Sequence, residues 1–187
     1  MKAIMPENDH HPVFILTGGT GSGKTTFLLQ MIEILRESGL SVSGFAAVSV
    51  PRDGPSHSYD LLDLGSGKMH PLASASFSEG WEQTGGFYFD PEGIRTGRRI
   101  FEDARIRHVD LMVVDEVGPF ELDGKIWAGN LSRILPRRPC SMLLVVREKL
   151  VQQVVGHWHL DDVVIIDIRQ TEPDLAADAV ISKTGMR

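Results

Sequence analysis

Apolar runs alternate with segments of helical periodicity along the chain. Unbroken apolar runs predict buried strands at residues 13–17, 42–50, 111–115, 141–146 and 163–168. Apolar positions spaced three and four residues apart, or turn signals, predict helices at residues 24–38, 91–107, 125–135, 148–155 and 174–183. Because wholly apolar strands are typical of a sheet covered on both faces, we expect a three-layer α/β/α fold with a mostly parallel sheet.

The segment between residues 50 and 90 departs from this alternation. Residues 59–64 and 69–72 read as strands that flank the glycine-containing turn 65–68, and a further strand is expected at 86–90. No helix separates these strands, so we predict an antiparallel excursion here. We expect a flexible N-terminus at residues 1–12 and a single domain over 13–187.

Composition and charge narrow the range of partners. The chain has 187 residues, of which 42% are apolar and 24% charged, which is ordinary globular usage. It contains no apolar stretch of about 18 residues, its first dozen residues are polar, and Cys140 is its single cysteine. The net charge of −6 disfavours nonspecific nucleic-acid binding. We therefore expect a cytoplasmic monomer that binds neither membrane nor nucleic acid.

A glycine-rich loop lies between the first predicted strand and the first predicted helix. Residues 18–25 match the pattern G-x-x-x-x-G-K-[ST] at every fixed position. Backbone N–H groups of such a loop, together with the helix N-terminus, bind phosphate oxygens. We expect Lys24 to hold the terminal phosphates and assist catalysis, and Thr25 to ligate Mg²⁺ through its hydroxyl. The predicted nucleotide-binding residues are Gly19, Thr20, Gly21, Ser22, Gly23, Lys24, Thr25 and Thr26.

Two acidic residues stand at the carboxyl end of the strand predicted at 111–115, of which Asp115 is its last residue and Glu116 follows directly. Ligands of α/β sheets bind at the carboxyl ends of the strands, so we expect Asp115 to support Mg²⁺ and Glu116 to orient or deprotonate a water aimed at the γ-phosphate. The alternative interpretation is that Asp115 and Glu116 are two surface acids without a role in catalysis. Residues 115–118 also match D-x-x-G, a mark of GTPases, but the companion N-K-x-D motif is absent from the sequence. No guanine-specific pocket is therefore expected.

Several basic residues give weaker signals. Arg147 follows the strand predicted at 141–146, and it is interpreted either as a catalytic contact to the γ-phosphate or as a surface arginine. An arginine stripe from Arg95 to Arg105 is interpreted as a solvated helix face, with phosphate contact or a partner surface as alternatives. Trp127 and Cys140 are expected in the core.

Four blocks of sequence together resemble the THEP1-type nucleoside-triphosphatases: residues 17–26, 42–45, 114–122 and 145–148. The most specific is D-E-[IV]-G-x-x-E-L at 115–122. The resemblance spans about residues 13–168 and implies a P-loop fold of the additional-strand catalytic-glutamate type, with Mg²⁺-dependent hydrolysis of several nucleoside triphosphates to diphosphate and phosphate.

By position, the resemblance makes Lys24 and Thr25 the phosphate and metal residues, Asp115 the metal acid and Glu116 the base. Glu121 belongs to the family block with no assigned chemistry, and a capping or loop-fixing role is expected for it. One stretch departs from the family, because residues 46–52 lack its T-x-E-V-R pattern.

Three functions remain open on the sequence. The first is hydrolysis of nucleoside triphosphates. The second is a small-molecule or nucleotide kinase, which needs an acceptor pocket and an arginine-rich lid such as the stripe at 95–105. The third is a nucleotide-binding adaptor for cofactor assembly, against which Glu116 argues because a binding protein needs no base.

Overall fold

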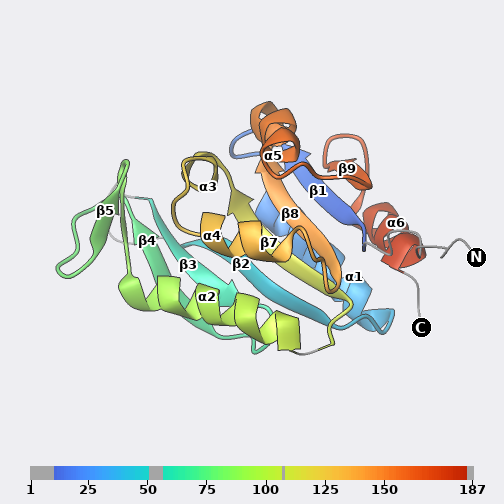
Figure 1. Ribbon diagram of the computed structural model, residues 1–187, viewed down its shortest axis with the longest axis horizontal. Coiled ribbons are helices and arrows are strands. Elements are labelled where there is room, and N and C mark those ends of the chain that lie inside the picture. The colour runs from blue at the N-terminus through green and yellow to red at the C-terminus, as the bar shows by residue number, and fades with distance from the viewer. Residues whose placement is uncertain (1–10, 51–56, 107, 185–187) are drawn as a thin grey trace, which may run out of the picture.

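A computed structural model describes residues 11–50, 57–106 and 108–184 (Figure 1). In these residues nine strands form one sheet in the order β5-β6-β4-β3-β2-β7-β8-β1-β9. The strands are β1 (Val13–Gly18), β2 (Val42–Val50), β3 (Ser58–Asp63), β4 (Met69–Ser74), β5 (Glu82–Thr84), β6 (Phe87–Phe89), β7 (Leu111–Val117), β8 (Ser141–Arg147) and β9 (Val163–Asp167). A flexible N-terminus is expected at residues 1–12, of which residues 1–10 lie outside the described part.

Five neighbouring strands, β2, β7, β8, β1 and β9, run parallel and form one half of the sheet. Side chains along β1 alternate between two cores: Val13 and Ile15 face one side of the sheet, and Phe14 and Leu16 face the other. Strand β8 separates β1 from β7, and thus stands between the strand before the glycine-rich loop and the strand that carries Asp115. This is the additional strand that the family resemblance implies.

The segment predicted as an antiparallel excursion extends the same sheet. Strand β3 pairs antiparallel with both β2 and β4, and β6 continues the sheet beyond β4. Strand β5 was not predicted, because its three residues are polar and carry no alternation. Figure 1 shows these strands reaching away from the end of the molecule where β9 and α6 lie.

Helices cover both faces of the sheet, as the apolar strands predict. The helices are α1 (Lys24–Glu37), α2 (Pro91–Ile106), α3 (Pro119–Leu122), α4 (Ala128–Ile134), α5 (Val151–His157) and α6 (Pro173–Thr184), with a 3₁₀ turn at Glu148–Leu150. Helices α1 and α6 pack on one face, and α2, α4 and α5 pack on the other. The three-layer α/β/α prediction is confirmed.

Helix boundaries differ from the predictions around the acidic block. The helix expected at 125–135 starts at Ala128, and the short helix α3 precedes it. Trp127 caps α4 and is buried, and Cys140 is buried too, as expected. The end of α2 was expected at residue 107, which lies outside the described residues. Among the described residues, no helix is long and apolar enough to span a membrane.

Candidate functional site

The glycine-rich loop joins the end of β1 to the start of α1, as the motif predicts. Gly21 and Gly23 adopt φ angles of 68° and 86°, in the left-handed region that glycine tolerates best. Gly23 caps α1, and its carbonyl accepts the first bond of the helix from the N–H of Phe27. Thr20, Gly21, Ser22, Gly23 and Thr26 are exposed. The loop therefore presents its backbone and the helix N-terminus at the surface, where a phosphate chain can reach them.

Lys24 lies within this loop although it carries a charge. Its side chain is only 8% exposed, and its Nζ donates to the carbonyl oxygen of Gly19 at 2.7 Å. The same carbonyl accepts from the hydroxyl of Ser22 at 2.8 Å. The ammonium is thus held inside the loop, where it can meet the terminal phosphates of a bound nucleotide.

Thr25 and Asp115 come together across the sheet although 90 positions separate them in sequence. The hydroxyl of Thr25 donates to Oδ2 of Asp115 at 3.1 Å, and the backbone N–H of Ala47 donates to the same oxygen at 3.1 Å. Asp115 is 1% exposed, and burial, followed by the neighbouring charge of Glu116, raises its pKa to about 7. The two side chains predicted for the metal are therefore adjacent.

Their donor set fits Mg²⁺. In the described part of the chain, no three His, Cys, Asp or Glu side chains gather as a ligand cage. A nucleotide-associated Mg²⁺ needs no such cage, because it takes hard oxygen ligands mostly from phosphate and water and only one or two from the protein. One hydroxyl and one carboxylate at hydrogen-bond distance match that requirement.

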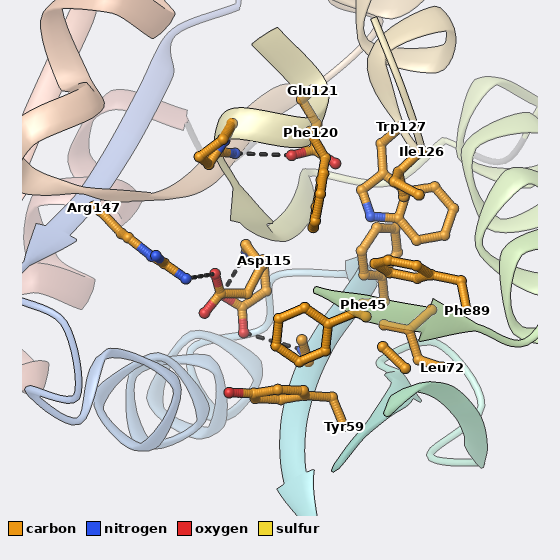
Figure 2. A pocket seen from close by; sticks show the side chains of 16 residues that line it. Phe45, Tyr59, Leu72, Phe89, Asp115, Phe120, Glu121, Ile126, Trp127 and Arg147 are labelled. Carbon is orange, nitrogen blue, oxygen red and sulfur yellow. Dashed lines mark hydrogen bonds and ion pairs between the residues drawn. The ribbon is translucent and has the colours of Figure 1, made fainter. Parts of the chain in front are cut away.

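Glu116 leaves the regular path of β7. Its φ is 56°, and the register of β7 against β8 shifts between Val114 and Val117. Such a bulge redirects a side chain and occurs often beside active sites. The carboxylate of Glu116 is 43% exposed and lies 3.5 Å from the guanidinium of Arg147, which ends β8 (Figure 2). Both residues therefore reach the carboxyl edge of the sheet, as predicted.

Glu121 shapes the turn after β7. Its side chain is 2% exposed and accepts a hydrogen bond at 2.9 Å from the N–H of Gly118, the cap of α3. Burial raises the pKa of Glu121 to about 7, against hydrogen bonds from backbone groups of Gly118, Glu121 and Trp127 that lower it. The carboxyl group thus fixes the segment between α3 and α4, which agrees with the expected capping or loop-fixing role.

A pocket of about 220 Å³ lies beside Glu116 and was not predicted from the sequence. Figure 2 shows Arg147 and the acidic groups at one side of it and a group of aromatic rings at the other. The aromatic residues that line it are Phe45, Tyr59, Phe87, Phe89, Phe120 and Trp127. The sequence predicts only a strand at residues 86–90 and a core position for Trp127, and neither prediction indicates a pocket.

The arginine stripe of α2 lies elsewhere. Arg95, Arg98 and Arg99 are exposed, as the solvated-face interpretation expects, and Arg95 pairs with Glu92 one turn away. Arg95 and Arg98 line a second groove, which shares Phe89 and Ile126 with the aromatic pocket but does not include Glu116. The side chain of Arg105 lies outside the described part. The structure does not bring Arg95 or Arg98 to the aromatic pocket as a lid.

Comparisons with known sequences match most of the chain. A family model described as "NTPase" matches residues 13–181. The nucleoside-triphosphatase THEP1 of Archaeoglobus fulgidus is 34% identical over 122 residues, covering 65% of this chain and 70% of that protein. The protein of the same name from Methanopyrus kandleri is 26% identical over 171 residues, covering 91% of this chain and 84% of that protein.

Two solved structures have the same fold. The crystal structure of THEP1 from the hyperthermophile Aquifex aeolicus superimposes with a TM-score of 0.68 at 20% identity, over 93% of this chain and 99% of that one. The solution structure of a human cancer-related nucleoside triphosphatase gives a TM-score of 0.67 at 21% identity, over 92% of this chain and 96% of that one. The P-loop α/β fold expected from the sequence is therefore confirmed.

Proposed function

This chain belongs to the NTPase family, and from that premise we propose that it hydrolyses nucleoside triphosphates, with Mg²⁺, to nucleoside diphosphate and phosphate. One observation carries the proposal. Glu116, the acid predicted to act on water, directly follows Asp115, which accepts a hydrogen bond from the phosphate-loop residue Thr25. The loop that holds phosphate and the side chain that can accept a proton are thus joined at one edge of the sheet.

The binding roles follow from the geometry. The N–H groups of the loop from Gly19 to Thr26 bind the phosphate chain, and Lys24 contributes its charge at the terminal phosphates. Thr25 and Asp115 would hold Mg²⁺, which supplies charge that offsets the phosphate oxygens. All of these groups are assigned to the phosphates or to the metal, so we propose broad base specificity.

The proposed catalytic residues are Glu116 and Arg147, whose side chains are both partly exposed. Glu116 positions the attacking water and accepts its proton, which leaves the oxygen free to attack the γ-phosphorus. Arg147, 3.5 Å from Glu116, stabilises the charge on the γ-phosphate oxygens from within the same chain. We further expect the protein to act as a cytoplasmic monomer with one domain over residues 13–187.

The test of this proposal is Glu116→Gln, which keeps the shape of the side chain and removes the base. Phosphate release should fall about 10²- to 10⁴-fold, the usual share of a general base. Affinity for ATP and Mg²⁺ should stay close to that of the unaltered protein, because Lys24, Thr25 and Asp115 remain. Glu33→Gln is the matched control, since Glu33 is an exposed acid on α1 outside the site.

The outcomes separate the three candidate functions. Unchanged phosphate release in Glu116→Gln would remove the catalytic-glutamate mechanism, and an adaptor would show little turnover before or after the change. Phosphoryl transfer to a small molecule is the second candidate, because a pocket large enough for an acceptor borders Glu116. A kinase that uses Glu116 for its acceptor would lose transfer while slow hydrolysis persists.

A further inference from the structure

The aromatic pocket lies on the γ-phosphate side of the proposed site. Glu116, Asp115 and Arg147 line it, whereas no residue of the phosphate loop does. In a P-loop the backbone cradles the α- and β-phosphates, and the lysine reaches the β- and γ-phosphates. A nucleotide whose γ-phosphate faces Glu116 therefore directs its sugar and base away from Glu116. The pocket therefore lies beyond the γ-phosphate end of a nucleotide bound in this way.

The lining of this pocket is aromatic rather than polar. The sequence has eight phenylalanines, three tryptophans and two tyrosines, and six of these residues line the pocket. Ring centroids lie 4.9 Å apart for Phe45 and Trp127 and 5.6 Å apart for Phe89 and Phe120. Separations of this kind favour tilted and edge contacts, which a further flat ring can join.

Several of these rings are only half-buried. Tyr59, Phe87 and Phe120 keep part of their surface open, and Tyr59 and Phe87 contact each other edge to face at 5.9 Å. Core residues of this size are normally covered, so rings left open around a cavity favour a ligand over simple packing.

The size and polarity of the pocket define the ligand class. An apolar cavity of about 150 Å³ binds benzene. A pocket of about 220 Å³ therefore has room for a substituted ring or a compact pair of fused rings. The polar end offers carboxylates, which accept hydrogen bonds, and the guanidinium of Arg147. A hydroxyl group on the ring compound would have Glu116 as its acceptor.

We propose that this pocket binds a small planar aromatic compound bearing a hydroxyl group, which takes the γ-phosphoryl group in place of water. The inference rests on the proposed function, since it uses the same phosphate loop and the same Glu116. The hydroxyl oxygen forms a bond to the γ-phosphorus as the bond to the β,γ-bridging oxygen breaks. Glu116 takes the hydroxyl proton, and the products are a nucleoside diphosphate and a phosphate monoester.

The first arm of the test measures binding with 2-naphthalenemethanol as the probe and cyclohexylmethanol as its non-planar counterpart. The full chain, labelled with ¹⁵N at its tryptophan indoles, is saturated with Mg²⁺ and a non-hydrolysable ATP analogue. We expect the planar probe to shift the signal of Trp127 and to leave Trp81 and Trp158, which do not line the pocket, in place. The cyclohexyl compound should bind at least tenfold more weakly.

The second arm follows ATP turnover by ³¹P NMR. With the planar alcohol present, its phosphate monoester should appear beside inorganic phosphate. Ala73→Leu fills the pocket and should lower ester formation at least tenfold. Tyr59→Leu, at a half-buried position, is the second variant if Ala73→Leu does not fold, and it should lower ester formation too. Phe77→Leu is the matched control, because Phe77 is a 74% exposed aromatic residue outside the pocket.

Three results would overturn the proposal. The first is a Trp127 signal that does not respond to the planar probe. The second is a Trp127 shift caused by the ATP analogue alone together with exclusion of the probe, which would make the pocket a base site. The third is binding of the alcohol with inorganic phosphate as the sole product. Failure of the hydrolase proposal would look different, because phosphate release without any alcohol would then be missing while the probe still shifts Trp127.

Discussion

The two halves of the sheet meet where β2 pairs with β3, and they present different chemistry on either side of Asp115 and Glu116. The parallel half offers backbone N–H groups, a helix N-terminus and the ammonium of Lys24, which suit a phosphate chain. The antiparallel half contributes Tyr59, Phe87 and Phe89 to a group of aromatic rings that suits a flat carbon-rich molecule. Phe45 of β2, Phe120 of α3 and Trp127 complete this group.

The difference shows how each kind of site is encoded. A phosphate loop depends on backbone conformation, so glycines such as Gly21 and Gly23 must stand at fixed places in the sequence. The aromatic pocket depends on strand register, which brings Tyr59 opposite Ala73 and Ala73 opposite Phe89. Small residues opposite large ones leave the space between the rings. Spacing in the sequence reveals the first arrangement and hides the second.

The largest effect that separates the two halves is expected from Lys24→Ala. The change removes the buried cation of the phosphate loop and alters no residue that lines the aromatic pocket. We expect tight triphosphate binding to be abolished and kcat/KM to fall by about 10³-fold, about 4 kcal/mol. Calorimetry with ATP and a phosphate-release assay measure this.

Lys68→Ala is the control for that variant, because Lys68 is an exposed lysine in the turn between β3 and β4. Wild-type affinity for ATP in Lys24→Ala would show that the phosphate loop is assigned wrongly. An equal loss in Lys68→Ala would show that the effect follows from net charge.

A change confined to the other half is Gly97→Ala. A Cβ on Gly97 of α2 would lie 2.3 Å from the buried indole of Trp127, a wall of the aromatic pocket. Alanine ordinarily stabilises a helix by up to about 1 kcal/mol relative to glycine, but a clash with a rigid ring costs more. We expect a net loss of about 2 kcal/mol in the free energy of unfolding, with ATP affinity retained. Urea denaturation measures it.

Gly129→Ala is the matched control, since Gly129 lies in α4 and a Cβ there meets no atom within 4 Å. This control should be neutral or slightly stabilising. Stabilisation of similar size in both variants would mean that the contact between α2 and Trp127 is loose, and that the pocket wall is not fixed from behind.

Much of the fold could be predicted because its parallel half is regular. Apolar runs such as residues 13–17 and 141–146 correspond to strands covered on both faces, and the alternation of strand and helix indicated the layers. Strand β5 and helix α3 were missed, because three or four residues carry no measurable period. The join between the two halves was missed too, since the pairing of β3 with β2 depends on contacts distant in sequence.

The sequence could predict those residues of the candidate site that belong to recognisable motifs. The hydrogen bond from Thr25 to Asp115 and the approach of Arg147 to Glu116 show that these side chains meet where their positions in the sequence predict. Their roles in metal binding and catalysis stay predictions. Three features of the site could not be predicted. They are the bulge that redirects the side chain of Glu116, the hydrogen bond that the N–H of Ala47 donates to Asp115, and the pocket beside these residues. Each depends on how strands align in space, which local sequence does not specify.

The stability of the protein should depend on pH through Glu121, which lies in α3 and lines the aromatic pocket. Its pKa lies near 4.5 in an unfolded chain and about 7 when folded, so between these values the folded state keeps a proton that the unfolded state has lost. The stability contributed by this group is therefore full below about pH 4.5 and lost as the pH rises through 7. Glu121→Gln keeps an oxygen for the N–H of Gly118 without the charge.

We expect Glu121→Gln to match the wild type near pH 5 and to exceed it at pH 8 by about 2 kcal/mol in the free energy of unfolding. Urea titrations at a series of pH values measure this difference. Glu102→Gln, at an exposed position of α2, should show no such trend. A difference that does not change with pH would mean that Glu121 stays ionised across the range and acts by its hydrogen bonds alone.

The smallest effect is expected from changing the base of the nucleotide. In the proposed site the parallel half would hold the phosphates and the aromatic pocket would lie on the γ-phosphate side of Glu116, so we expect neither region to contact the base. We expect kcat/KM for ATP, GTP, CTP and UTP to agree within about tenfold, about 1.4 kcal/mol. A preference beyond about a hundredfold, about 2.7 kcal/mol, would require a dedicated base site. Repeating the series with Tyr59→Leu locates such a site: if the preference disappears in this variant, the aromatic rings bind the base and the two halves of the sheet hold two ends of one nucleotide.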